Sequence, residues 1–201
     1  MTKRNSSTNG SEHDAGLLVQ WIKKAKKGDL ESYQKIYDLF ARKVLNFIYR
    51  MVNSVEEAED LTQETFVTVY QKLESLKDND KFEPWLFRIA RNYVYQKYRS
   101  RPPATISVDA TDDEGQEIIQ LADERKNPDQ EYQASELRDV IQSVVADLPE
   151  KYREVFVLSA LKRLRYEEIA EIVGRSLPSV KTDIHRARLE VRKKVKDYLR
   201  G

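Results

Sequence analysis

Residues 166–200 read YEEIAEIVGRSLPSVKTDIHRARLEVRKKVKDYLR and end one residue before the C-terminus. Apolar residues at helical spacing predict a short helix, with Ile169, Ala170 and Val173 on its buried side, and a second helix that packs against it. Gly174 between them permits the left-handed turn that ends a helix. This pattern is typical of a helix-turn-helix, whose second helix inserts its N-terminal residues into the major groove of DNA.

The predicted second helix has an apolar side and a basic side. Val180, Ile184, Ala187 and Val191 recur at helical spacing and dock it onto its neighbour. From Leu177 to Arg200 there are eight Lys or Arg against three acids, so the helix attracts phosphate. The outward side and its flanks carry the candidate DNA-contacting residues Pro178, Ser179, Lys181, Thr182, His185, Arg186 and Arg188. A helical hairpin with a solvated basic face is the alternative for this segment.

The composition limits both the fold class and the chemistry. The 201 residues include 34% charged residues and only six Gly and six Pro, which favours small helical domains over a sheet rich in turns. There is no cysteine, so a disulfide framework or a thiolate zinc site is impossible. His13 and His185 are the two histidines and lie far apart in the sequence. We therefore expect an all-α protein without a metal site or other cofactor.

No apolar run approaches the ~20 residues that a membrane span needs, so we expect no membrane insertion. Residues 1–16 are polar and lack the apolar segment of a signal peptide, which predicts a disordered tail and a cytoplasmic protein.

Apolar stripes predict two helical domains. Four helices are expected within residues 17–100, with Ser54 capping the third and Glu57 as its reciprocal partner. Residues 101–130 are acidic, aperiodic and poor in aromatics, which is typical of a flexible linker. Residues 131–201 are expected to form the second domain, in which Asp147 caps a helix and Glu150 completes a capping box.

The fourth predicted helix, near residues 84–100, has two different sides. Its polar side carries Arg88, Arg91, Asn92, Tyr95, Tyr98 and Arg99. Arginines that hold a backbone, rings that stack on bases and an amide that reads a base edge suit single-stranded nucleic acid. Phe82 and Trp85 are candidates to wedge against an unstacked base. Alternatively, these two rings belong to the core and the arginines only solubilise the helix.

Residues 56–66, EEAEDLTQETF, hold five acids and no base. Asp60, Gln63, Glu64 and Val67 lie along one side of the expected third helix. Paired carboxylates could bind a metal or act as acid and base, but no histidine, lysine nucleophile or phosphate-binding glycine loop accompanies them, so we do not expect an enzyme. A docking surface for a basic protein partner and a merely solvated face both remain open.

Four motifs occur in this order along the chain: EEAEDLTQETF, FEPWLFRIARNYVYQKYRSR, LPEKYREVFVL and YEEIAEIVGRSLPSVKTDIHRAR. The ordered set resembles the extracytoplasmic-function (ECF) sigma factors of bacterial RNA polymerase, over residues 17–100 and 131–198. The resemblance implies a promoter-specificity subunit whose partners are the clamp helices and flap of core polymerase, promoter DNA and an anti-sigma factor.

The resemblance also implies roles for individual residues. It places Asp60, Gln63 and Glu64 against core polymerase. It places one set of residues on a melted −10 element: Asn79, Phe82, Trp85, Arg88, Arg91, Asn92, Tyr95 and Arg99. It places Pro178, Ser179, Lys181, Thr182, His185, Arg186 and Arg188 on the −35 element, and the acidic linker along the RNA exit channel.

Two points stay open in the sequence. Asp183 stands where the family commonly has a basic residue; it either pairs with Arg186 or repels a phosphate. The run from Ser176 to Val180 also departs from the family's common Pro-x-Gly-Thr-Val, which leaves the −35 preference undetermined. Two other classes of protein would use parts of the same sequence: a helix-turn-helix regulator that acts without polymerase, and a protein-interaction adaptor whose basic residues are incidental.

Overall fold

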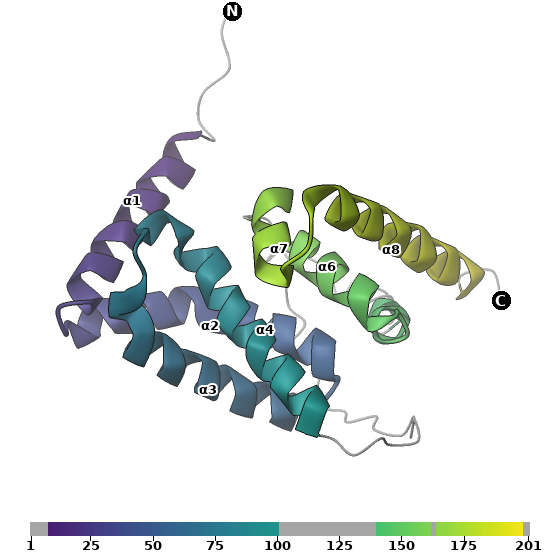
Figure 1. Ribbon diagram of the computed structural model, residues 1–201, viewed down its shortest axis with the longest axis horizontal. Helices are drawn as coiled ribbons and strands as arrows, with labels where there is room; N and C mark the ends of the chain where they lie inside the picture. Colours follow the sequence, from purple (N-terminus) through teal and green to yellow (C-terminus); the bar gives the residue numbers. More distant parts are fainter. Residues whose placement is uncertain (1–7, 101–139, 162–163, 199–201) are drawn as a thin grey trace, which may run out of the picture.

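The computed structural model describes residues 8–100, 140–161 and 164–198, without side-chain detail for residues 8–15. Every regular element in these ranges is helical, as the sequence predicts. The chain folds into two groups of helices that pack side by side (Figure 1). The first unit contains α1 (Thr8–Ala25), α2 (Leu30–Val52), α3 (Val55–Lys72) and α4 (Phe82–Ser100), with two short 3₁₀ turns, η1 (Leu73–Ser75) and η2 (Asn79–Lys81), before α4.

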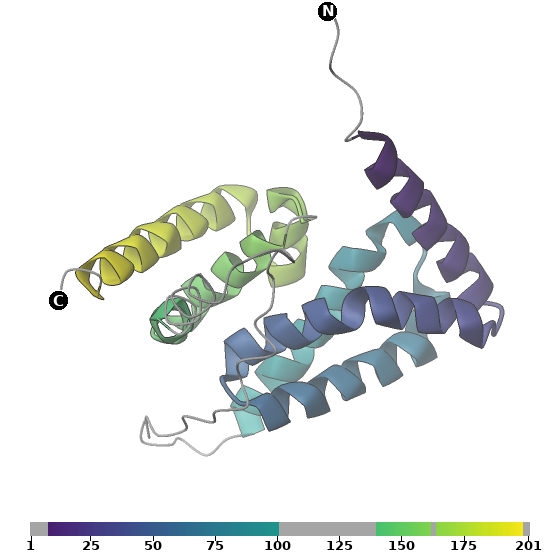
Figure 2. The ribbon, with the colours of Figure 1, turned by 180° about the vertical axis from the view of Figure 1, so that it is seen from behind.

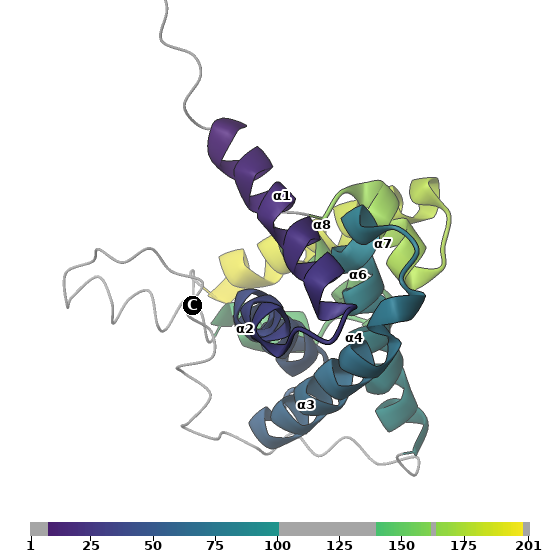
Figure 3. The ribbon, with the colours of Figure 1, turned by 90° about the vertical axis from the view of Figure 1, so that its left-hand side faces the viewer.

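Helices α2, α3 and α4 form the core of the first unit, and α1 crosses the end of this group and extends away from it (Figures 2 and 3). The core contains two edge-on ring pairs, Phe40 with Phe82 and Phe47 with Phe87, whose centroids lie 5.4 and 5.6 Å apart. Such pairs stabilise a core beyond the area that they bury.

The turns of the first unit follow from local residues. Asn53 takes the left-handed conformation (φ 56°) and donates its N–H to the Tyr49 carbonyl, which ends α2. The Ser54 hydroxyl then accepts from the Glu57 N–H at 3.3 Å and caps α3, so the predicted serine cap is confirmed.

The second unit contains a helical segment at 140–146, then α6 (Glu150–Ala160), α7 (Tyr166–Val173) and α8 (Leu177–Tyr198). Gly174 has φ +69° and donates its N–H to the Ala170 carbonyl, which confirms the predicted glycine turn of the helix-turn-helix. Val180, Ile184 and Ala187 are buried on the inner side of α8.

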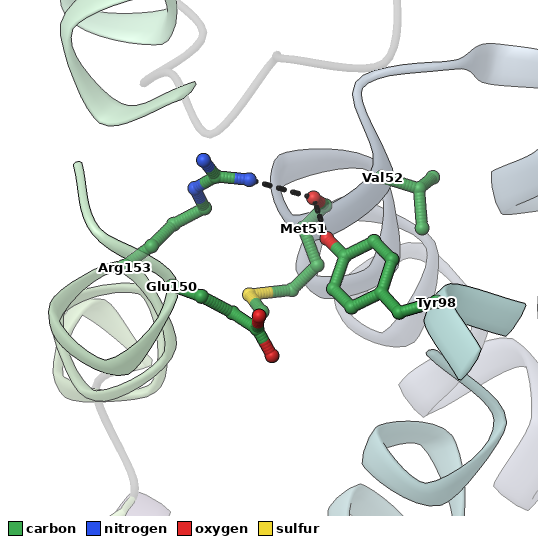
Figure 4. A pocket seen from close by; sticks show the side chains of 5 residues that line it. All are labelled: Met51, Val52, Tyr98, Glu150 and Arg153. Atoms are coloured by element: carbon green, nitrogen blue, oxygen red, sulfur yellow. Dashed lines mark hydrogen bonds between the residues drawn. The ribbon is translucent and has the colours of Figure 1, made fainter. Parts of the chain in front are cut away.

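The two units contact each other through α4 with α7 and through α2 with α6. The backbone carbonyl of Met51, near the end of α2, accepts from the Tyr98 hydroxyl of α4 and, at 3.0 Å, from Nη1 of Arg153 of α6 (Figure 4). Arg153 also donates to the carbonyls of Ala146 and Leu148. A cation therefore joins the C-terminal ends of two helices, where the helix dipole favours positive charge.

Two local expectations are wrong. Helix α1 begins at Thr8, so residues 8–16 are helical and do not belong to a disordered tail. Asp147 does not cap α6: the N-cap is Pro149, and the Asp147 carboxylate instead accepts from Lys194 at 3.0 Å. The linker predicted at 101–130 and the start of the second domain at 131–139 lie outside the described residues, as do residues 1–7.

Candidate nucleic-acid interface

The outward side of α8 has the division that the sequence predicts. Six of the seven candidate residues are exposed and Ser179 is half-buried, while Val180, Ile184 and Ala187 face the core. Thr182 donates its hydroxyl to the Pro178 carbonyl at 2.9 Å within the first turn of the helix. Arg186 reaches the Tyr152 hydroxyl of α6 at 3.4 Å. The burial confirms the two sides of this helix, and contact with DNA stays a prediction.

Asp183 forms its ion pairs with Arg175 and Lys151 rather than with Arg186, and repulsion of a phosphate stays a prediction. Its side chain is 3% exposed and faces the interior of the helix-turn-helix. One carboxylate oxygen accepts from Arg175 Nη1 at 2.8 Å, and the other lies 3.4 Å from Lys151 Nζ. The Asp183 carboxylate on α8 therefore links this helix to the preceding turn through its ion pair with Arg175. Local spacing suggested Arg186 as its partner, but the structure supplies cations from other elements.

The acidic side of α3 is exposed at all three predicted positions. Asp60, Gln63 and Glu64 line a groove of about 460 Å³ together with Val67 and with Tyr93 of α4. Val67 is 56% exposed, so this surface offers an apolar contact beside its charges.

Gln63 also lines a second groove of about 550 Å³ on the other side of α3. The α2 residues of this groove were not among the sequence candidates; they are Tyr37, Ala41, Arg42 and Leu45. Tyr37 and Leu45 are half-buried, and Arg42 is exposed. Tyr37 and Leu45 lie at the edge of the apolar stripe of α2, and this position in the pattern could have identified them, whereas the spacing does not single out Arg42.

The α4 candidates divide into three groups. Arg88, Asn92 and Arg99 are exposed, while Trp85, Arg91 and Tyr95 are half-buried. Phe82 is 0% exposed. The expectation that Phe82 wedges against a base is therefore wrong for this structure, because its ring lies wholly within the core against Phe40. Phe82 precedes the buried Leu86 by one helical turn, so its burial could have been predicted from the spacing.

The second unit covers part of the polar side of α4. Arg91 Nε donates to Oε1 of Glu154 on α6, and Oε2 of the same carboxylate accepts from Arg175 Nη2 at 3.2 Å. Glu154 is only 2% exposed, and this burial raises the pKa of its carboxyl despite both arginines. Burial also raises the pKa of the Tyr95 hydroxyl, whose ring lies under Arg91 at 4.3 Å.

A second contact lies at the end of α7. Arg88 Nη2 donates to the backbone carbonyl of Glu171 at 3.1 Å, and Lys81 Nζ lies 3.3 Å from the Glu171 carboxylate. Two cations of the predicted −10 surface, Arg88 and Arg91, therefore have oxygen partners in the second unit, and so does the neighbouring Lys81. Carboxylate and carbonyl oxygens occupy positions that phosphate oxygens could also fill.

Asn79 lies in η2, directly before α4, and is half-buried. Its side-chain oxygen accepts from Lys26 Nζ at 2.6 Å, and the same ammonium group donates to the Leu76 carbonyl at 2.5 Å. The sequence alone gave no reason to include Lys26, since it precedes this segment by about fifty residues.

Comparisons with known families define the class of this protein. Residues 36–102 match the family described as Sigma-70 region 2, and residues 138–191 match Sigma-70, region 4. The chain is 36% identical over 183 residues to the ECF RNA polymerase sigma factor SigW of Bacillus subtilis, an alignment that covers 90% of this chain and 98% of SigW. It is 32% identical to the ECF RNA polymerase sigma-E factor of Escherichia coli, over 89% of this chain and 94% of that protein.

The chain therefore belongs to the ECF sigma factors of RNA polymerase. It is an alternative sigma factor that functions in promoter-directed initiation of transcription.

Solved structures show the same fold. CnrH, solved in complex with the cytosolic domain of CnrY, matches with a TM-score of 0.64 at 21% identity, over 90% of this chain and 98% of CnrH. The sigma factor RpoE of Bartonella quintana, solved with the anti-sigma factor NepR, matches with a TM-score of 0.65 at 22% identity, over 83% and 98% of the two chains. Among the described helices of this chain, none has the length and apolar character needed to cross a membrane.

Proposed function

We propose that the first unit binds core polymerase through α3 and a melted −10 element through α4, while α8 of the second unit reads the −35 element. The separation of charge supports this division most directly. The exposed Asp60 and Glu64 of α3 line one groove, whereas the candidate cations of α4 and α8 do not line it. An acidic groove with exposed apolar residues suits a basic protein partner, and cationic helical faces suit nucleic acid.

The residues assigned to core polymerase are Asp60, Gln63 and Glu64. Those assigned to the −10 element are Asn79, Trp85, Arg88, Arg91, Asn92, Tyr95 and Arg99; Phe82 is not included, because it is buried. Those assigned to the −35 element are Pro178, Ser179, Lys181, Thr182, His185, Arg186 and Arg188. Arg88 and Arg91 must exchange their partners in the second unit before they hold DNA.

The protein acts by binding rather than by catalysis, in the cytoplasm where polymerase works. Neither DNA surface alone offers many contacts, and holding both on one polymerase raises the effective concentration of each for its element. Trapping unstacked bases on α4 offsets the few kcal/mol that unstacking costs. An anti-sigma factor is a further expected partner, since RpoE of Bartonella quintana was solved in complex with one.

Transcription from a promoter library with purified core polymerase tests the proposal, with transcript starts as the readout. Asp60→Lys with Glu64→Lys should abolish association with core polymerase. Lys181→Ala with His185→Ala should leave association intact and reduce use of promoters with a −35 element. Glu167→Gln, an exposed change on α7, serves as the control.

The two rival classes predict different results. A regulator independent of polymerase would bind duplex promoter DNA tightly as the free protein. An adaptor would bind DNA weakly, without sequence preference and less at higher salt. Absence of any transcript from every template would refute the proposed function.

A further inference from the structure

Lys26 is held in a defined turn between α1 and α2. Its backbone N–H donates to the Ile22 carbonyl at 3.0 Å, and Gly28 two residues later takes φ +89° and donates to Ala25 at 3.0 Å. Glycine tolerates this left-handed conformation without steric cost. The Lys26 side chain therefore starts from a fixed position and reaches across to the segment that precedes α4.

That segment is itself ordered by short-range hydrogen bonds. Leu76 is buried and anchors one end. The Asp78 carboxylate accepts from the Asp80 N–H at 3.0 Å, and the Asp78 carbonyl accepts from the Lys81 N–H at 3.1 Å. Lys26 adds two hydrogen bonds between this loop and the rest of the unit, at the Leu76 carbonyl and the Asn79 amide.

The chemistry of the ammonium group fixes which way the Asn79 amide faces. An ammonium group only donates hydrogen bonds, so the Asn79 atom that faces it at 2.6 Å must be the oxygen. The amide nitrogen, with its two N–H donors, is then directed away from Lys26. A charge-assisted hydrogen bond of this kind is stronger than a neutral one and holds the orientation.

We propose that Lys26 is a positioning residue that biases the base accepted at Asn79, because it reserves the amide oxygen and presents the amide N–H groups. This rests on the proposed −10 role of Asn79. Asparagine reads adenine by accepting from N6 and donating to N7. An N6 amino group that donates to the same oxygen would lie beside the Lys26 ammonium, whose charge repels it. A base edge with two acceptors, such as O2 and N3 of cytosine or O6 and N7 of guanine, has no such conflict.

The experiment measures base preference, which a merely structural role for Lys26 would not change. Core polymerase reconstituted with each variant transcribes templates that carry each of the four bases at every position of the −10 element. Lys26→Met has nearly the same length but no donor, and should raise the use of adenine relative to cytosine at one position by about tenfold. Lys26→Arg retains a donor and should preserve the wild-type preference. Lys27→Met, an exposed neighbour, is the matched control.

Asn79→Ala should flatten the preference at the same position and at no other. Thermal unfolding of each variant shows whether it folds, and a Lys26→Met protein that does not fold while Lys26→Arg does would overturn the proposal in favour of a structural role. An equal loss of transcription for all four bases, or an unchanged preference, would also overturn it. A wild-type protein that yields no transcript from any template would instead refute the proposed function, and this inference with it.

Discussion

Replacing Glu154 with glutamine tests whether the second unit competes with DNA for α4. Glu154 pairs with Arg91 of the first unit and with Arg175 of its own unit, and it is 2% exposed. Glutamine keeps the shape and one acceptor oxygen but removes the charge. Of these two pairs, the one with Arg91 joins the two units and the one with Arg175 lies within the second unit, so the variant should loosen the packing of the units without unfolding either one.

The size of the effect follows from the burial of the three side chains. Removing one partner of a fully buried ion pair costs about 3–5 kcal/mol. The Arg91 and Arg175 side chains are 23% and 24% exposed, so water reaches them, and glutamine still accepts a hydrogen bond. Charged hydrogen bonds contribute roughly 1 kcal/mol more than neutral ones. We therefore expect a loss of about 1–2 kcal/mol from the contact between the units, or roughly tenfold in its equilibrium.

Two measurements on the free protein follow this change. The chain has no cysteine, so Lys72→Cys on α3 and Lys193→Cys on α8 provide sites for a pair of dyes. Energy transfer between the dyes should fall in Glu154→Gln. Fluorescence anisotropy with a single-stranded −10 oligonucleotide should show affinity rising by up to about tenfold, because apparent affinity scales with the fraction of protein whose site is accessible.

The control is Glu167→Gln, which makes the same charge change at an exposed position of α7. If Glu154→Gln and Glu167→Gln bind the oligonucleotide equally and give equal energy transfer, the reasoning is refuted. A fall in affinity would show that Glu154 supports the DNA-binding form.

Three further predictions concern stability and its dependence on pH. Gly174→Ala should destabilise the second unit by roughly 1–2 kcal/mol, since φ +69° strains any residue with a Cβ. Gly16→Ala within α1 should instead stabilise the protein by up to about 1 kcal/mol. Thermal unfolding measures both variants, and equal effects would contradict the turn geometry at Gly174. Asp183→Asn should lower the unfolding temperature through its lost pair with Arg175 yet leave the −35 sequence preference unchanged, because the side chain faces inward; a changed preference in the promoter library would contradict this. Burial raises the pKa of the Glu154 carboxyl, so the folded protein favours its protonated form. The stability gained from this preference is present below the ordinary pKa of a glutamate and is lost as the pH rises through the raised value. Denaturant titrations between about pH 4 and about pH 8 should therefore show a flatter pH dependence for Glu154→Gln, and identical pH profiles would contradict this.

Helix positions and faces could be predicted from the sequence because they depend on near neighbours. Ser54 and Gly174 act within one turn of their own backbone, and both predicted roles are confirmed. Asp147 does not cap α6 because Pro149 is the N-cap residue, and the Asp147 carboxylate instead accepts from Lys194, which is distant in the sequence. The positions and faces of a helix are set by residues close in the sequence. The partner of a long charged side chain instead depends on which helices pack against each other in the fold.

The same distinction applies to the candidate site. The exposed side of α8 and the acids of α3 lie where periodicity predicts them. The partners of Arg91 and Asn79 could not be predicted, since Glu154 and Lys26 lie 63 and 53 residues away in the chain. Lys26 is one of several lysines in its segment, and only the fold shows which of them faces η2.

The two proposed DNA surfaces differ in their exposure and in the partners of their cations in this structure. The outward side of α8 is exposed, so it can meet duplex DNA without rearrangement of the units. On α4, Arg88 and Arg91 already hold oxygens of Glu171 and Glu154. Transfer of these arginines to phosphate replaces one oxygen partner with another, so the guanidinium groups keep hydrogen-bonded partners and the electrostatic cost of the exchange is small. Under the proposed function, the α4 surface is therefore covered in this structure and becomes available to DNA when these two arginines exchange their partners.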